Sequence, residues 1–271
     1  MNQPPSTITM LLSRHTRRRE FIMLLGSVAM WPFAARAQQR ERMRRIGVLM
    51  PAAADDTEFQ MRVGAFQQGL EQSGWTIGKN AGIDTRWATS NGSEIRRHAT
   101  ELVALAPDVI LANGASTVGP LLQATRTVPI VFAAVADPVG AGFVDSLARP
   151  GGNATGFTSF DYGLSAKWLE LPRDRAGVAV LRDPAISSGI GQFGVIQATA
   201  TALGVEAIPI SLRDAAEVEH AVATFARSAN GGLILTASGL AYAHRDLIIT
   251  LAARHNYLRF ISSVPSLPVA D

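Results

Sequence analysis

Small polar residues follow a predicted buried strand at the point where a helical pattern begins. Asn113, Ser116 and Thr117 come directly after the apolar run 109–112. The first N–H groups of a helix have no partner inside the helix, and they attract anions. The backbone N–H groups from Ala115 to Thr117 and the Ser116 hydroxyl are therefore candidate donors to a ligand carboxylate. Ser and Thr also cap helix starts without any ligand, and this alternative stays open.

Two aspartates occupy the same kind of position after other apolar runs. Asp137 follows the run 128–133, and Asp183 follows the run 178–181. A carboxylate at either place is a candidate binding group, and Asp137 in particular is a candidate acceptor for a ligand amine. Asp side chains also cap helices. Asp137 therefore has a second interpretation as the cap of a helix that begins near Val139, and Asp183 is open to the same alternative.

Most catalytic and cofactor-binding patterns are missing from the chain. It contains no cysteine, which excludes disulfides, thiolate catalysis and cysteine-built metal sites. The histidines are scattered, and none has a second histidine at the spacing of a helical metal site. There is no G-x-S-x-G nucleophile elbow and no G-x-x-x-x-G-K-S/T phosphate loop, and the glycine-rich stretch 189–194 is interpreted as a helix start. We therefore expect no cofactor, no metal and no enzymatic activity.

Short apolar runs alternate with helical patterns from Arg45 onward. The predicted strands of the first half are 46–50, 83–87, 109–112 and 128–133, and the predicted helices between them are 59–70, 94–105 and 116–125. This alternation is typical of a parallel α/β sheet. Ligands bind such sheets outside the carboxyl ends of the strands, which is where the polar residues named above are expected.

A Gly- and Pro-rich passage at 149–153 interrupts the alternation, and we place the boundary between two lobes there. Residues 154–159 are predicted as an extended segment that crosses between the lobes, and Phe160 or Tyr162 beside it is a candidate aromatic lid. The later predicted helices are 164–171, one that carries Phe193 and Leu203, 215–227 and 241–254, and the later strands are 178–181, 205–210, 233–236 and 258–261. The second lobe therefore repeats the element order of the first.

Residues 1–37 have the pattern of a secretory signal, with a short membrane anchor or a buried helix as the alternative. A cationic segment with Arg18-Arg19 precedes the apolar run 21–31, which is too short to span a membrane, and Ala35-Arg36-Ala37 is a small-x-small cleavage site. The arginine pair followed by Glu20-Phe21 resembles a twin-arginine export signal. Five arginines and one glutamate give this segment a charge of +4, and the whole chain carries +3, so the rest carries −1. The body therefore lacks the basic footprint of a nucleic-acid-binding protein.

Several stretches of the chain together resemble one family. They are Phe66-Gln67-Gln68-Gly69-Leu70, Pro107-Asp108-Val109-Ile110, Val128-Pro129-Ile130-Val131-Phe132, Asp137-Pro138-Val139-Gly140-Ala141-Gly142-Phe143-Val144, Leu147-Ala148-Arg149-Pro150-Gly151-Gly152-Asn153-Ala154-Thr155-Gly156, Lys167-Trp168-Leu169-Glu170, Val178-Ala179-Val180-Leu181-Arg182-Asp183-Pro184 and Leu251-Ala252-Ala253-Arg254-His255. In this order they resemble the exported solute-binding proteins of bacterial ABC transporters, in the subgroup that contains tryptophan and tyrosine binders. The resemblance covers nearly the whole chain.

The resemblance implies a type I periplasmic-binding-protein fold with two doubly wound parallel-sheet lobes. The expected domains are a twin-arginine signal peptide at 1–37, cleaved near Ala37, an N-terminal lobe at 38–153 and a C-terminal lobe at 154–271. Such a protein is a monomer in the periplasm. It binds a small molecule such as an amino acid between the lobes, which close like a hinge, and delivers it to the membrane permease of an ABC transporter.

The chain departs from the family pattern at its end. The second lobe of the family normally continues beyond the point that corresponds to Asp271, so we interpret this chain as C-terminally truncated with an incomplete second lobe. A remnant that binds no solute is therefore the alternative. An enzyme of the flavodoxin or Rossmann type is disfavoured by the missing motifs, and a ligand-sensing transcription-factor lobe would need a helix-turn-helix region in place of the signal.

Overall fold

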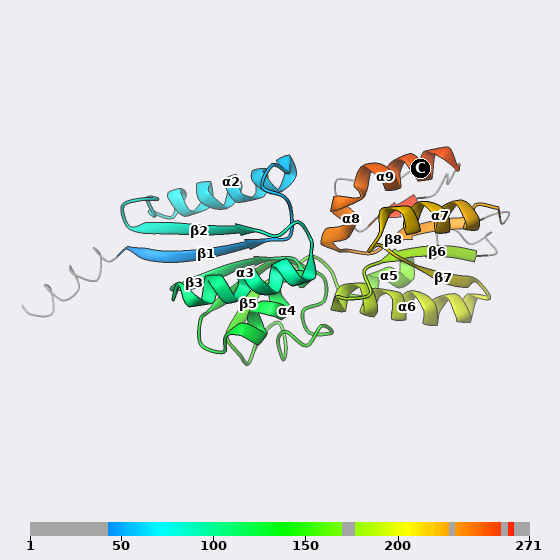
Figure 1. Ribbon diagram of the computed structural model, residues 1–271. Helices are drawn as coiled ribbons and strands as arrows, with labels where there is room; N and C mark the ends of the chain where they lie inside the picture. Colours follow the sequence, from blue (N-terminus) through cyan, green and yellow to red (C-terminus); the bar gives the residue numbers. More distant parts are fainter. Residues whose placement is uncertain (1–42, 170–176, 228–230, 256–259, 263–271) are drawn as a thin grey trace, which may run out of the picture.

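Two lobes of similar architecture make up the protein in its computed structural model (Figure 1). The structure describes residues 43–169, 177–227, 231–255 and 260–262, so the predicted signal sequence lies outside the described residues. Each lobe is built on one sheet of parallel strands with helices packed against it. No helix in the described ranges is long and apolar enough to cross a membrane.

The first lobe contains a five-stranded sheet in the order β2-β1-β3-β4-β5. Its strands are β1 (Arg44–Met50), β2 (Ala81–Trp87), β3 (Val109–Asn113), β4 (Ile130–Val135) and β5 (Ala154–Thr158), and its helices are α2 (Thr57–Gln72), α3 (Gly92–Ala104) and α4 (Ala115–Ala124). β1 pairs with β2 on one side and with β3 on the other. The strand order therefore reverses at β1, and a doubly wound sheet binds its ligand at such a switch point.

Apolar side chains fix the sheet of the first lobe between two layers of helices. Val48 of β1 packs with Phe59 and Val63 of α2. The next residue, Leu49, packs on the opposite face with the cluster that contains Leu102 of α3. Successive strand residues point to opposite faces, so the unbroken apolar run in β1 is what a strand covered on both sides requires. Packing on both faces holds the carboxyl end of β1 in place.

The second lobe contains a four-stranded sheet in the order β7-β6-β8-β9. Its strands are β6 (Gly177–Arg182), β7 (Glu206–Ser211), β8 (Gly231–Leu235) and β9 (Phe260–Ser262), and its helices are α5 (Leu164–Lys167), α6 (Ser187–Leu203), α7 (Ala215–Phe225), α8 (Gly239–Ala243) and α9 (Arg245–Arg254). The central strand β6 pairs with β7 and β8. The switch point of this lobe therefore lies between β6 and β8, as in the first lobe between β1 and β3.

Three local expectations differ from the structure. Residues 154–158 pair in parallel with β4 as the edge strand of the first sheet, so they do not cross between the lobes, and this sheet extends beyond the boundary placed after residue 153. The helix expected at 241–254 is divided into α8 and α9 because His244 leaves helical backbone angles, with φ −102° and ψ 14°. No helix begins near Val139, where the chain instead forms turns.

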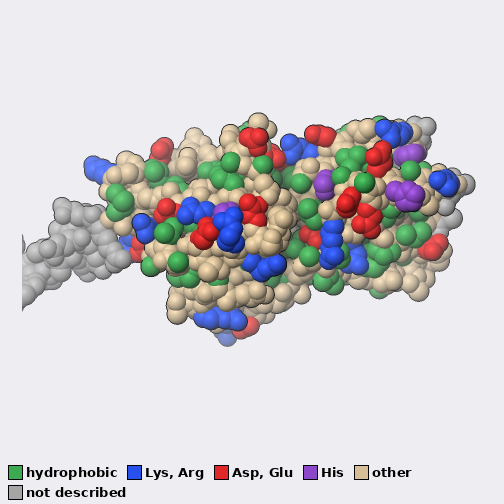
Figure 2. All heavy atoms as spheres, in the orientation of Figure 1, with side chains coloured by type: hydrophobic (Ala, Val, Ile, Leu, Met, Phe, Trp, Pro, Cys, Tyr) green, Lys and Arg blue, Asp and Glu red, His purple; other side chains and the backbone are tan. Residues whose placement is uncertain are grey.

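Charged side chains of both signs are interspersed on the face of the molecule that Figure 2 shows. Lys and Arg side chains alternate with Asp and Glu side chains over both lobes. This arrangement agrees with the small net charge of the chain outside its N-terminal segment.

Candidate functional site

The carboxyl ends of the strands of both sheets meet at a cleft between the lobes. An inner cavity of about 260 Å³ lies there, and its wall includes Pro51 after β1, Gly114 after β3 and Ala237 after β8. The starts of α4 and α6 also contribute to the wall. Residues beside the switch points of both sheets thus converge on one cavity, as the doubly wound topology predicts.

Helix α4 of the first lobe begins at the inner cavity without a side-chain cap. Its N-cap residue is Gly114, whose φ of 79° lies in the left-handed region that glycine adopts without strain. The first N–H groups of any helix, here those of Ala115 and Ser116, have no intrahelical acceptor, and glycine has no side chain that could accept a hydrogen bond from them. Both residues line the cavity. An anion placed there would interact favourably with the positive end of the helix.

Helix α6 of the second lobe begins at the same cavity, and it also lacks a side-chain cap. Its N-cap residue, Ile186, offers no side-chain oxygen, and Ile186 and Ser188 both line the cavity. By contrast, side-chain oxygens of Asp56, Asn91 and Asp214 cap α2, α3 and α7. Two positive helix ends from opposite lobes are therefore open to one cavity.

Arg62 of α2 adds a positive charge and lies between two aromatic rings at the cavity wall. Its guanidinium carbon lies 4.6 Å from the Phe59 ring centroid and 4.9 Å from the Tyr242 ring centroid. It donates hydrogen bonds to the Tyr242 hydroxyl at 2.8 Å and to Asn113 Oδ1 at 3.4 Å, and it forms an ion pair with Glu58. Burial alone would lower the pKa of Arg62, but Tyr242 and Glu58 outweigh burial and hold this pKa above its ordinary value. Arg62 is therefore a permanent cation.

Side chains of the two lobes touch directly on the α2 side of the cleft. Tyr242 belongs to α8 but packs with the apolar cluster between β1 and α2, and its ring meets that of Phe59 edge-on at 5.3 Å. Arg245 of α9 donates a hydrogen bond to Asp56 Oδ2 at 2.8 Å. Burial alone would raise the pKa of Asp56, but the hydrogen bonds from Arg245 and from backbone N–H groups of α2 outweigh burial and lower it. These contacts join the two lobes on this side of the cleft.

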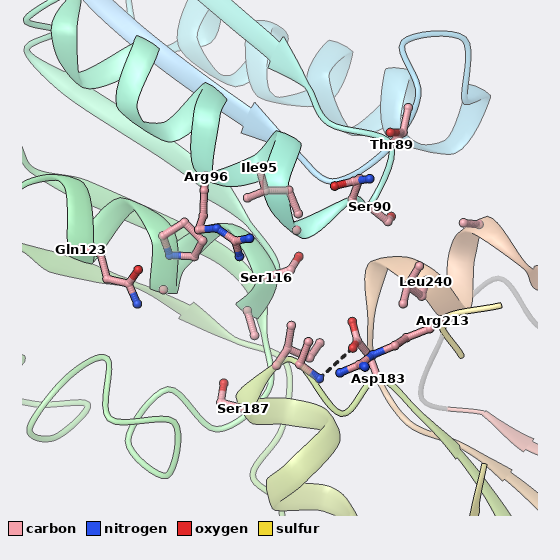
Figure 3. A pocket seen from close by; sticks show the side chains of 18 of the residues that line it. Thr89, Ser90, Ile95, Arg96, Ser116, Gln123, Asp183, Ser187, Arg213 and Leu240 are labelled. Carbon is pink, nitrogen blue, oxygen red and sulfur yellow. Dashed lines mark hydrogen bonds between the residues drawn. The ribbon is translucent and has the colours of Figure 1, made fainter. Parts of the chain in front are cut away.

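An outer cavity of about 680 Å³ adjoins the inner one, and both are lined by Ala115, Ser116 and Ile186. In Figure 3, Arg96 and Ser116 of the first lobe face Asp183 and Arg213 of the second. Asp183 is 6% exposed, and its Oδ1 accepts a hydrogen bond from the Ala185 N–H at 2.9 Å. Within the described ranges, no three His, Asp or Glu side chains gather as a metal-binding group.

The structure brings four of the six predicted ligand-binding residues to the cavity walls. Asn113, Ala115 and Ser116 line the inner cavity, and Asp183 lines the outer one. Thr117 is fully buried, and its hydroxyl donates to the carbonyl oxygens of Asn113 at 3.0 Å and of Gly114 at 2.9 Å. Thr117 therefore stabilises the start of α4 from the buried side of the helix and does not face the cavity.

Asp137 lies outside the walls of both cavities. Its Oδ1 accepts a hydrogen bond from the Gly140 N–H at 2.7 Å, and its Oδ2 accepts one from the Tyr162 N–H at 3.3 Å. This carboxylate therefore fastens a turn to the segment that follows β5. Of the two candidate lid residues, Phe160 lines the inner cavity and Tyr162 does not.

Sequence patterns alone do not predict Arg62, Tyr242 or Arg245 as site residues. Arg62 had a usable signal, because it is a cation within the first two turns of the helix that follows the switch-point strand β1. Tyr242 and Arg245 stand in what the sequence predicts as one continuous helix. Their approach to α2 depends on the break at His244 and on how the two lobes meet, which no local pattern indicates.

Comparisons with known proteins identify the family. The profile described as ABC transporter substrate binding protein matches residues 46–257. A tyrosine-binding protein from Clostridioides difficile (strain R20291) is 37% identical over 106 residues, which span 39% of this chain and only 30% of that relative.

Two solved structures share the fold. An ABC domain from Streptococcus pneumoniae in complex with L-Trp has a TM-score of 0.71 at 18% identity, with 82% of this chain and 75% of that chain covered. A conserved domain protein from Vibrio cholerae O1 biovar El Tor has a TM-score of 0.73 at 23% identity, with 83% and 75% covered. The two parallel-sheet lobes are thus those of a periplasmic-binding-protein fold. Because the family profile matches most of the chain, this protein belongs to the ABC transporter substrate binding protein family.

Proposed function

We propose that this protein binds a small solute through its carboxylate in the inner cavity and delivers it to the membrane permease of an ABC uptake transporter. Residues 1–37 serve as a cleaved export signal, and the protein works as a monomer in the periplasm. The observation that carries the proposal is the pair of uncapped helix starts, α4 and α6, that reach the same cavity from opposite lobes.

A carboxylate that contacts both helix starts favours the closed form of the cleft. A helix end contributes about 0.3–1 kcal/mol to a nearby exposed charge, and up to about 2 kcal/mol in a partly buried site. Because one helix belongs to each lobe, an anion between them gains both contributions only when the cleft is closed. A ligand that binds the closed form more strongly shifts the lobes toward closure.

The rest of the inner cavity suits an apolar ligand body. Phe59, Phe160 and Tyr242 line it, and a volume of about 260 Å³ is just below the range of about 300–1,000 Å³ typical of pockets for drug-sized ligands. A single ring with a short acidic chain matches this combination. One relative is named a tyrosine-binding protein and one solved structure of this fold holds L-Trp, and both of these ligands combine an aromatic ring system with a carboxylate.

Thermal unfolding with and without a panel of aromatic acids and amino acids tests the proposal. A ligand at a hundred times its dissociation constant stabilises a folded receptor by about 2.7 kcal/mol. This raises the melting temperature of a protein of this size by about 5–10 °C. A cooperative melt that moves with at least one carboxylate supports the proposal. A melt that moves with none would instead support the alternative of a non-binding remnant.

Ser116→Asp is the variant that tests the location of the site. It places a fixed carboxylate in the first turn of α4, which favours the helix but repels a ligand carboxylate, so we expect at least a tenfold loss of affinity with no loss of stability. Ser93→Asp is the matched control, because Ser93 is also the second residue of its helix, α3, and lines neither cavity. Equal losses in both variants would contradict the location.

A further inference from the structure

The inner cavity is positive on several sides, and among the described residues that line it there is no carboxylate. Arg62 is its cationic side chain, and the ion pair with Glu58 already offsets part of that charge. The uncapped starts of α4 and α6 add partial positive charge from the two lobes. A carboxylate ligand meets complementary charge here, whereas a ligand ammonium meets none.

Three acidic side chains on the elements around this cavity are already engaged. Asp137, the residue that the sequence suggested for a ligand amine, uses both oxygens to bind the backbone N–H groups of Gly140 and Tyr162. Glu58 forms the ion pair with Arg62. Asp56 caps α2 and binds Arg245 of the other lobe.

Asp183 lies in the wall of the outer cavity and is absent from the wall of the inner one. It is 6% exposed and accepts a hydrogen bond from the Ala185 N–H. The α-ammonium of an amino acid is separated from its carboxylate by a single carbon. With the carboxylate held at the starts of α4 and α6, the ammonium would therefore be desolvated beside Arg62 without a counter-ion, which is strongly unfavourable.

We propose that the solute is a monocarboxylate with an apolar, ring-sized body and without an α-ammonium group. This inference rests on the proposed function, and it narrows the substrate class from carboxylates in general to net anions. The rings of Phe160 and Tyr242 offer apolar contact, and the uncapped starts of α4 and α6 interact favourably with the single negative charge.

The test compares three ligands that differ only at the α-carbon: 3-phenylpropionate, L-3-phenyllactate and L-phenylalanine. Phenyllactate carries a hydroxyl where phenylalanine carries the ammonium, so this pair separates charge from size. Dissociation constants come from calorimetric titration of the purified protein at neutral pH. We expect phenylpropionate and phenyllactate each to bind at least tenfold more tightly than L-phenylalanine.

Each other outcome overturns a defined part of the account. If L-phenylalanine binds as tightly as phenyllactate or more tightly, the inference is wrong and the proposed function stands. If phenyllactate is as weak as L-phenylalanine while phenylpropionate binds well, size and not charge excludes the amino acid, and the charge argument is wrong. If neither these ligands nor the wider panel of acids and amino acids binds, the proposed function fails together with the inference.

Discussion

The ion pair between Asp56 and Arg245 should help to close the cleft, and its contribution can be isolated by a double-mutant cycle. The two charged groups lie 2.8 Å apart in different lobes, with 14% of the Asp56 side chain and 31% of the Arg245 side chain exposed. Exposed ion pairs contribute about 0.2–1 kcal/mol, and hydrogen bonds to charged groups contribute about 1.5–3 kcal/mol. For this half-buried pair we expect a coupling energy of about 1 kcal/mol.

The variants Asp56→Asn and Arg245→Met, alone and together, complete the cycle. Asn keeps a side-chain oxygen to cap α2, so the change affects mainly the charge. Because the pair forms only when the lobes meet, its loss favours the open form, and about 1 kcal/mol corresponds to about a fivefold weaker apparent affinity for a carboxylate. The assay is calorimetric titration with 3-phenylpropionate.

Arg254→Met is the matched control for Arg245→Met. Arg254 lies on the same helix, α9, but its ion pair is with Glu219 of α7 within the second lobe. This variant should bind the acid as the unmodified protein does. A second readout is the distance between spin labels at Gln68 and Thr250, which are easily placed because the chain has no cysteine. A coupling energy near zero, with unchanged label distances, would refute the role of this pair in closure.

Three further changes test other contacts. In Gly239→Ala, the new Cβ would lie 2.7 Å from Ser90 Oγ and 3.2 Å from the Pro51 carbonyl oxygen of the other lobe, so titration should show weaker ligand binding while thermal unfolding shows no loss of stability. Tyr242→Phe removes the acceptor of the Arg62 hydrogen bond. A hydrogen bond of this kind contributes about 1 kcal/mol, so the affinity for 3-phenylpropionate should fall about fivefold. Finally, the pKa of Asp56 lies below its ordinary value of 3.8. The ionised carboxylate therefore contributes fully to the free energy of unfolding above pH 3.8, and this contribution is lost as the pH falls further. Unfolding measured as a function of pH should show that Asp56→Asn loses less stability in acid than the unmodified protein does.

The alternation of apolar runs and helical patterns was sufficient to predict both sheets of this fold. Strands such as 46–50 and 109–112 are almost wholly apolar because helices cover both faces, and that pattern is visible without a structure. The edge strand at 154–158 was misinterpreted as a crossing segment. Its residues are largely exposed and lack the apolar run of an internal strand, so pairing with β4 determines its role.

The site could be predicted where it depends on topology within one lobe. Asn113, Ala115 and Ser116 follow a strand at the switch point, and the rule for doubly wound sheets places them at the ligand. Asp137 obeys the same rule in sequence, yet its oxygens bind backbone N–H groups of its own turn and of Tyr162. The position of an aspartate after a predicted strand does not show whether its carboxylate binds a ligand or fastens a loop.

Local sequence patterns do not predict the contacts between the lobes. Tyr242 meets Phe59 and Arg62 only because the two sheets face each other at their carboxyl edges. The periodicity of α2 indicates which side packs on its own sheet. It carries no information about a partner that lies more than a hundred residues later in the chain.

A crystal structure of the protein with 3-phenylpropionate is the most direct test of the central claim, that a ligand carboxylate binds between the starts of α4 and α6. We predict carboxylate oxygens within about 2.7–3.2 Å of backbone nitrogen atoms at these two helix starts, with the ring of the ligand against Phe160 and Tyr242. A ligand in the outer cavity, or one whose carboxylate points away from both helices, would contradict it.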